Sequence, residues 1–408
     1  MKCVRGRMFE SKLLYLVQTL LIAGTLFVFV RKEARLLQLQ VIAWGAGVIG
    51  IMWRYGTGGQ LGFYSNDQIQ YVAIVRILTT WQWGEGEAAS LFWWTEYSKF
   101  PYPASAVPLT LVGIHYSLAL KTVSIVFLLA LTRGILHRYA GTSLLSQTKA
   151  AYLTGCGLIG TFFSLLALRE TMMMYFVYRY VLARSLTGKL FAISVIFLLR
   201  SHLAAAIVAS EMVMSAWGWI TKRLKIGFAD VPALLIGGVT LGFTLFNLRF
   251  NRTQGYGLSR QLQTPFSSNF GIVDTSQIAS NFVGLQFLTS HEAFVKLSVS
   301  DLLLVRMVFS DTVLIPLIFT LIIVTCGNRL IWRHRFTVLV FSTYIGIVTN
   351  TDFNSFRQNI PLMPLMGMVI LDFLKDRKLQ KSSAPEDVSR ASDSSRRAVR
   401  HSVSNVAN

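Results

Sequence analysis

Residues 190–220 read LFAISVIFLLRSHLAAAIVASEMVMSAWGWI, an almost continuous apolar stretch that decides the fold class of this chain. Arg200 and His202 interrupt it, and Glu211 follows further along. A helix that crosses the hydrocarbon core of a bilayer needs roughly 20 mostly apolar residues. We expect two consecutive helices here, over 189–201 and 202–221, with the charged residues at the turn between them.

The whole chain has the composition of this stretch. Of its 408 residues, 53% are hydrophobic and 14% are charged, whereas a soluble domain carries about 25% charged residues. This composition excludes a water-soluble globular enzyme and a disordered chain. The net charge of +20 does not indicate a nucleic-acid partner, because excess Lys and Arg is what the cytoplasmic loops of membrane proteins carry. The sequence predicts an all-α, polytopic integral membrane protein.

The apolar runs predict about 10–11 transmembrane helices within a membrane domain of residues 1–375. The runs are 12–30, 36–54, 104–132, 150–168, 171–184, 189–201, 202–221, 230–249, 301–326, 336–350 and 359–375. Two of them, 171–184 and 189–201, are short for a bilayer, so we expect neighbouring protein to shield them at the centre of the bundle. The polar, basic stretch 376–408 predicts a disordered cytoplasmic tail.

The positions of Lys and Arg predict which loops face the cytoplasm. With the basic clusters after 132, 183, 221, 328 and 374 inside, the loops 55–103 and 250–300 lie at the outer face, with the turns at Arg169-Glu170 and Arg200-Ser201-His202. The first run, 12–30, does not fit, because its basic N-terminus would lie outside. Either this end violates the rule, or the run is not a complete span.

Arginines on the outer face are the most informative feature, because that side is normally poor in them. They are Arg169, Arg200, Arg249, Arg252 and Arg357. The planar guanidinium fork suits phosphate oxygens, so we predict that these residues bind a phosphate that enters from outside.

Three of these outer-face interpretations have structural alternatives. Arg169 could pair with the adjacent Glu170, Arg249 could extend its side chain to the interface at a span end, and Glu211 could be the intramembrane partner of Arg200 or His202.

The acid–base candidates are Asp67, Glu170 and His202. Asp67 starts a short interfacial helix, where its carboxylate could act as general base on a hydroxyl or cap the helix; the two roles are compatible. The Trp- and Tyr-rich stretch that follows is typical of an aromatic belt at headgroup level or of a sugar-binding surface. The three cysteines show no metal-ligand spacing, and no nucleotide-binding motif is present, so we expect neither a metal nor another cofactor.

At these residues the chain resembles the GT-C superfamily of membrane glycosyltransferases. The resemblance is carried by the Asn66-Asp67-x-x-x-Tyr71 helix, the Trp/Tyr/Pro-rich first outer loop and Arg357 before a Pro-x-x-Pro span. GT-C enzymes use polyprenyl-phosphate sugars, and their first outer loop carries a catalytic Asp. Many of them have two neighbouring acids there, whereas this chain has Asn66-Asp67, which puts metal-assisted catalysis in doubt.

The chain is also similar to bacterial O-antigen and exopolysaccharide polymerases, through the Leu168-Arg169-Glu170 turn, the Arg200-x-His202 step and the long outer loop. Those polymerases join lipid-pyrophosphate-linked glycans. Both resemblances imply glycosyl transfer at the outer face of a bacterial inner membrane, with a polyprenyl-linked sugar and membrane lipids as partners, in assembly of the cell envelope. The alternatives are a lipid-linked oligosaccharide flippase, another anion transporter, or a scaffold subunit. The oligomeric state stays open.

Overall fold

The computed structural model describes residues 2–57, 65–81, 100–224, 235–242, 244–245, 313–325, 327–348 and 359–382. Within these ranges all regular structure is helical, which confirms the all-α class. Three helical segments there are long and apolar enough to cross a membrane: Ser11–Val30, Arg35–Tyr55 and Tyr116–Tyr139. Four further apolar segments of the described part, Ile69–Thr80, Leu186–Leu199, Ser201–Ala216 and Val313–Thr325, are 10–17 residues long, so length and composition alone support three spans.

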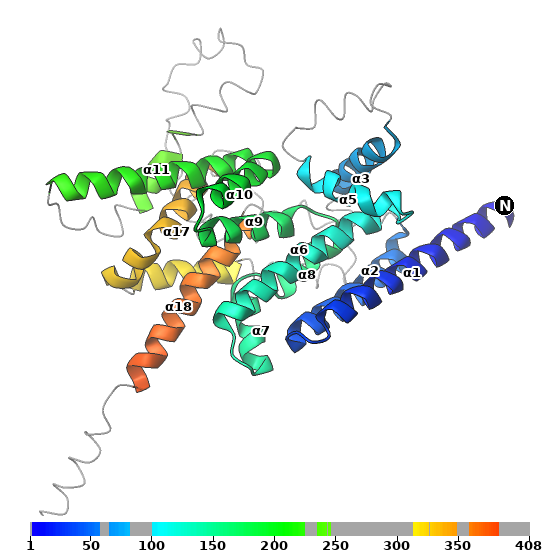
Figure 1. Cartoon of the computed structure of the whole chain (residues 1–408), viewed down its shortest axis with the longest axis horizontal. Helices are drawn as coiled ribbons and strands as arrows, with labels where there is room; N and C mark the ends of the chain where they lie inside the picture. Colours follow the sequence, from blue (N-terminus) through cyan, green and yellow to red (C-terminus); the bar gives the residue numbers. More distant parts are fainter. Residues whose placement is uncertain are drawn as a thin grey trace, which may run out of the picture.

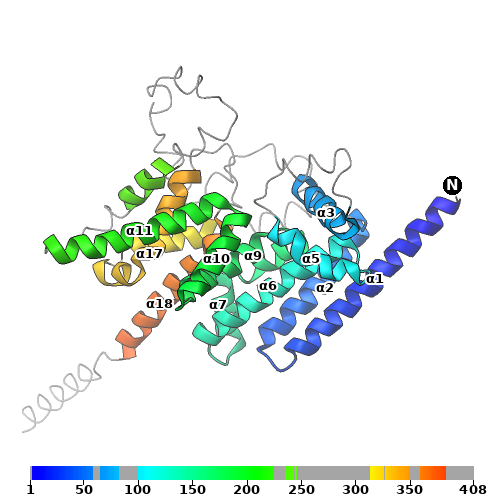
Figure 2. The same ribbon diagram turned by 45° about the horizontal axis from the view of Figure 1, so that its top comes forward.

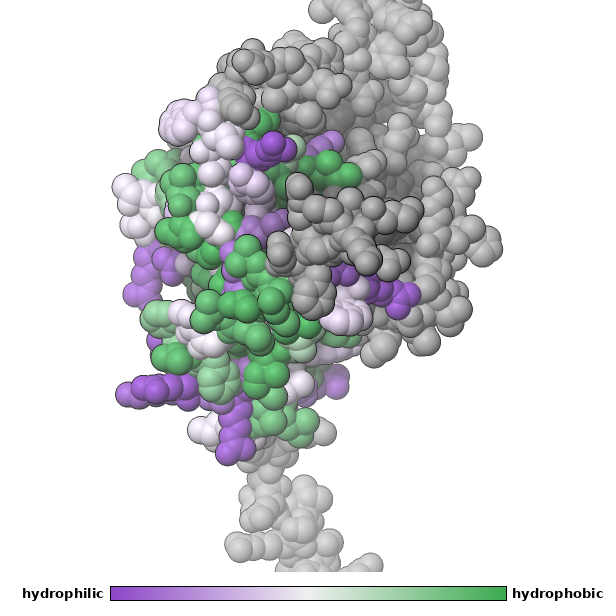
Figure 3. Space-filling model, turned by 90° about the vertical axis from the view of Figure 1, so that its right-hand side faces the viewer, coloured by the Kyte–Doolittle hydropathy of each residue, from purple (hydrophilic) through white to green (hydrophobic). Residues whose placement is uncertain are grey.

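The first two spans form a helical hairpin. α1 (Lys2–Val30) and α2 (Arg35–Tyr55) run side by side (Figure 1). Glu33, in the turn between them, forms an ion pair with Arg133, which lies near the end of α6 (Tyr116–Tyr139). The distance from Oε1 of Glu33 to Nη2 of Arg133 is 2.9 Å. Much of α1 is exposed and apolar, including Leu21 and Phe29. On the face shown in Figure 3, hydrophobic surface gathers in a broad middle zone, as expected of a chain that contacts lipid.

Two shorter helices cover one end of α6. They are α3 (Ser65–Thr80) and α5 (Pro101–Leu111), which lie close together in Figures 1 and 2. The apolar run 104–132 is thus split between α5 and α6. The break falls at Gly113, whose φ of 88° is open to glycine at little steric cost.

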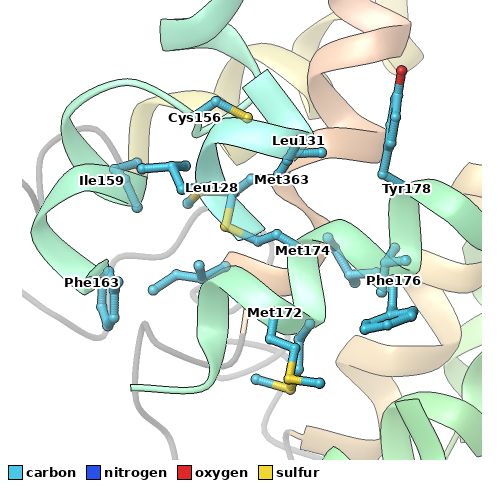
Figure 4. Packing of buried hydrophobic residues seen from close by; sticks show 14 of the residues in the cluster. Leu128, Leu131, Cys156, Ile159, Phe163, Met172, Met174, Phe176, Tyr178 and Met363 are labelled. Atoms are coloured by element: carbon cyan, nitrogen blue, oxygen red, sulfur yellow. The ribbon is translucent and has the colours of Figure 1, made fainter. Parts of the chain in front are cut away.

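The prediction of a single span over 150–168 is wrong. The chain instead forms α7 (Leu144–Leu153) and α8 (Leu158–Leu165), with a turn between them. Gly155 in that turn has φ 71°, and a Cβ there would meet Met363 at 2.9 Å and Met174 at 3.4 Å. Figure 4 shows these two methionines side by side in the core. A side chain at this position would collide with them, so glycine allows the chain to turn where hydropathy suggests a continuous helix.

The short helix α9 (Glu170–Leu182) is central, as expected for the run 171–184. Its methionines are buried (Figure 4), and it packs between α6 and α10 (Leu186–Leu199). The same expectation is wrong for 189–201, because α10 buries only one face, through Ala192, Ile196 and Leu199. The exposed face of α10 is apolar too, which suits lipid contact.

The C-terminal helices complete the bundle. α11 (Ser201–Leu224) packs along α17 (Gly327–Val348), and the short η4 (Ile360–Leu362) leads into α18 (Met363–Ser382). At one end of the bundle His334 of α17 pairs with Asp372 of α18 at 3.2 Å, and Arg333 pairs with Asp376 at 3.2 Å. Basic residues of one loop predicted to be cytoplasmic thus pair with acidic residues of α18.

Candidate functional site

Two helix starts meet in the interior of the bundle, each next to an arginine. Arg169 stands directly before α9, and Arg200 directly before α11. The guanidinium Nη1 of Arg169 donates a hydrogen bond to the carbonyl oxygen of Leu199, the last residue of α10. The first N–H groups of a helix lack intrahelical partners and carry a partial positive charge. Two such starts beside two guanidinium groups make this region electropositive.

A buried carboxylate pairs with Arg200. Glu170, the first residue of α9, places Oε1 3.7 Å from Nη2 of Arg200, and the two side chains are 0% and 4% exposed. Nη1 of Arg200 donates a hydrogen bond to the hydroxyl of Tyr344 on α17 at 3.1 Å. The guanidinium group of Arg200 therefore contacts both α9 and α17.

His202 lies against the same tyrosine. Its ring stacks on that of Tyr344 with the centroids 5.9 Å apart and the planes inclined by 11°. His202 is the second residue of α11 and is half-buried. The imidazole of His202 thus stacks on the same tyrosine whose hydroxyl accepts from Arg200.

The turn that carries Arg169 and Glu170 is held by α5 and α6. The hydroxyl of Tyr102 shares a 2.7 Å hydrogen bond with Ser124, and Ser124 donates to the carbonyl of Leu168 at 3.1 Å. Ala167 in this turn has φ 54°, a left-handed conformation that costs a residue with a Cβ on the order of 1–2 kcal/mol. Local strain of this kind is common where a chain is forced to present particular side chains.

No protein-family model, curated protein or solved structure matches this chain.

The structure brings together four of the eight predicted site residues: Arg169, Glu170, Arg200 and His202. Asp67 falls in the first turn of α3, and its side chain lies outside the described residues. The same holds for the whole of the three remaining arginines, which are Arg249, Arg252 and Arg357.

The suggestion that Glu211 pairs with Arg200 or His202 is wrong. Its carboxylate instead accepts from Lys189 Nζ at 2.7 Å and from the hydroxyl of Tyr180 at 3.3 Å. The reason is distance along α11, because a rise of 1.5 Å per residue places Glu211 roughly 15 Å from the start of the helix. Lys189 lies near the beginning of α10, which runs antiparallel beside it.

Two residues at or near the site escaped the sequence analysis. Tyr344 lies in an apolar run and gave no signal. Lys121 of α6 is fully buried, and its Nζ has no hydrogen-bond partner in the described part of the chain. A single lysine in the run 104–132 was a visible signal.

Burial lowers the pKa of nearby His115, and the charge of Lys121 lowers it further. In the described ranges no three His, Cys, Asp or Glu side chains come together as metal ligands.

Proposed function

We propose that this chain is a polytopic membrane enzyme that transfers glycosyl groups from polyprenyl-phosphate- or pyrophosphate-linked sugars at the outer face of a bacterial inner membrane, in the assembly of cell-surface polysaccharide. One observation carries the proposal: the guanidinium groups of Arg169 and Arg200 are buried together at the starts of α9 and α11. Helix starts and arginine forks are both well suited to hold phosphate.

The surroundings of the cluster favour a phosphate that belongs to a lipid. The helices next to it are apolar, and α10 exposes large hydrophobic side chains such as Phe191 and Phe197. A free inorganic anion would gain nothing from such neighbours. An amphiphile would bury its apolar part against them while its phosphate reaches the arginines. In this proposal α10 and α11 lie in the membrane with their common turn at the outer face, together with the remaining apolar helices.

Glycosyl transfer places a specific demand on each group. The bond between the anomeric carbon and the phosphate oxygen breaks, and its electron pair leaves with the phosphate. The acceptor hydroxyl forms the new bond and loses its proton to a base. Arg169 and Arg200 stabilise the charge on the leaving phosphate, and Asp67 or His202 takes the proton. Glu170 is better suited to hold Arg200, because its Oε1 lies 3.7 Å from Nη2 of that side chain in the interior.

The test is the length distribution of surface glycans in the native host. We expect Arg200→Lys to shorten the glycans, because lysine keeps the charge but loses the two-pronged fork, and Arg200→Ala to abolish extension. Arg133→Ala is the control, since Arg133 forms an exposed pair with Glu33 at the other end of α6. All variants are compared at equal protein levels in the membrane. Unchanged glycans in both Arg200 variants would contradict the proposal. Loss of outer-face lipid-linked precursor, with the polymerising activity intact, would favour a flippase.

A further inference from the structure

The turn between α1 and α2, the end of α6 and helix α7 lie together at one end of the bundle (Figures 1 and 2). Two contacts join these segments. The backbone N–H of Leu36, at the start of α2, donates to the side-chain oxygen of Gln147 on α7 at 3.4 Å. Glu33 of the turn pairs with Arg133 of α6. Parts of the chain that are far apart in the sequence thus share one surface at this end.

Exposed basic side chains gather on this surface, which we call the basic rim. Its members are Arg31, Lys32, Arg35, Arg133 and Lys149, all of them exposed. Acids are scarce around them, because the sequence from 97 to 169 contains no Asp or Glu, and Glu33 is the single acid from 31 to 35. Glu33 is already paired with Arg133. The rim is therefore electropositive and suits an anionic partner.

Large apolar side chains stand exposed beside the basic ones. Phe29 is 78% exposed and comes just before the basic turn, and Leu145 is 82% exposed. Leu145 and Lys149 are four residues apart on α7, so they lie on the same face of that helix. The first turn of α7 is capped by the hydroxyl of Ser143, which accepts a hydrogen bond from the backbone N–H of Ser146 at 3.3 Å. The rim therefore presents hydrocarbon and positive charge side by side.

The apolar residues decide between classes of anionic partner. A nucleic acid or an acidic protein surface would be attracted by the basic groups but would leave Phe29 and Leu145 in water. At a bilayer surface these two side chains enter the hydrocarbon boundary, while Lys and Arg reach phosphates with their apolar stems along the hydrocarbon. The apolar segment Ser11–Val30, long enough to cross a membrane, ends where the rim begins. On the face shown in Figure 3, hydrophilic surface likewise lies below the broad hydrophobic zone.

We propose that the basic rim binds the phosphate headgroups of anionic phospholipids, with Phe29 and Leu145 inserted at the boundary between headgroups and acyl chains. This binding fixes the depth of the α1–α2 hairpin and of α7 in one leaflet. Each exposed Lys or Arg near a membrane surface adds about fivefold to the affinity for anionic lipids. The proposal is independent of the proposed function, because it concerns the lipid around the protein and not a substrate.

The test compares an anionic and a zwitterionic lipid on the purified full chain in a non-ionic detergent. The probes are phosphatidylglycerol and phosphatidylcholine with identical acyl chains, and native mass spectrometry gives an apparent dissociation constant for each. The charge variants are Arg35→Gln, Lys149→Gln and the two combined, and Leu145→Gln removes an apolar anchor. Arg76→Gln is the matched control, since Arg76 is exposed on α3 at the opposite end of α6. Thermal unfolding checks that each variant is folded.

We expect wild type and Arg76→Gln to prefer phosphatidylglycerol, and Arg35→Gln and Lys149→Gln each to lower that preference about fivefold. Leu145→Gln should weaken the binding of both lipids and keep the ratio between them. Raising the salt from about 0.1 M to about 1 M, which shortens the screening length from about 10 Å to about 3 Å, should remove most of the preference. Absence of a preference in wild type, or an equal loss in Arg76→Gln, would overturn the proposal. Unchanged lipid binding in Leu145→Gln would indicate a surface for polyanions in general and overturn the lipid assignment.

Discussion

The charges of Glu170 and Arg200 should be strongly coupled in their effect on stability, because their ion pair is buried. The perturbation is a double-mutant cycle of Glu170→Gln, Arg200→Met and the two combined. At the observed separation of 3.7 Å, two unit charges attract by about 4 kcal/mol at the effective dielectric constant of ~20 that suits protein sites. Removing one partner leaves the other charge buried, which costs about 3–5 kcal/mol. We expect the double variant to lose less than the sum of the singles, with a coupling of about 3 kcal/mol.

The assay is equilibrium unfolding by SDS in mixed micelles, followed by tryptophan fluorescence. The pair between Lys189 and Glu211 provides an internal control, since its side chains are 33% and 40% exposed. A partly exposed pair of this kind contributes about 1 kcal/mol or less. Additive effects at Glu170 and Arg200, within about 0.5 kcal/mol, would refute the conclusion that these charges interact directly in the interior.

Two further effects follow from buried basic groups. Replacing Lys121 with Met should leave the free energy of unfolding unchanged or raise it, since a buried amine without a partner in the described residues costs desolvation energy. The control is Lys149→Met, at an exposed site of α7. A loss above about 2 kcal/mol for Lys121→Met alone would contradict this expectation. His115 accepts a hydrogen bond from Ser117 N through Nδ1 at 3.3 Å, and its pKa lies below the ordinary 6.5. As the pH falls, His115 is therefore protonated in the unfolded chain before it is protonated in the folded one. The free energy of unfolding should keep its full value above pH 6.5 and decrease as the pH drops below it. In His115→Asn, thermal unfolding measured from pH 7.5 to 5.5 should depend less on pH; an equal slope in both proteins would exclude His115 as the cause.

The hydropathy pattern located most of the helices, because lipid and the protein interior both favour apolar side chains along a helix. It failed at 150–168, where the break depends on the backbone of Gly155 and on Met363, more than 200 positions further along the chain. Composition cannot reveal such a contact. It also overstated the shielding of α10, because an apolar helix face packs equally well against lipid.

The sequence predicted which charged residues belong to the candidate site, but it did not predict which acid pairs with which base. An arginine in an apolar stretch is costly enough to be noticed, and so Arg169 and Arg200 stood out. The partner of each acid depends on how the helices pack, and this is why the alternative that paired Glu211 with Arg200 or His202 was wrong. Tyr344 was undetectable, since a tyrosine in an apolar run has no distinctive pattern.

The most direct test of the proposed chemistry is reconstitution of the purified chain in liposomes with a synthetic polyprenyl-pyrophosphate-linked oligosaccharide on the outer leaflet. Mass spectrometry then follows the glycan mass. The proposal predicts a product longer by whole donor units, formed by wild type and lost in Arg200→Lys. A glycan that keeps its original mass with folded wild-type protein, whether or not the lipid crosses the bilayer, would contradict it.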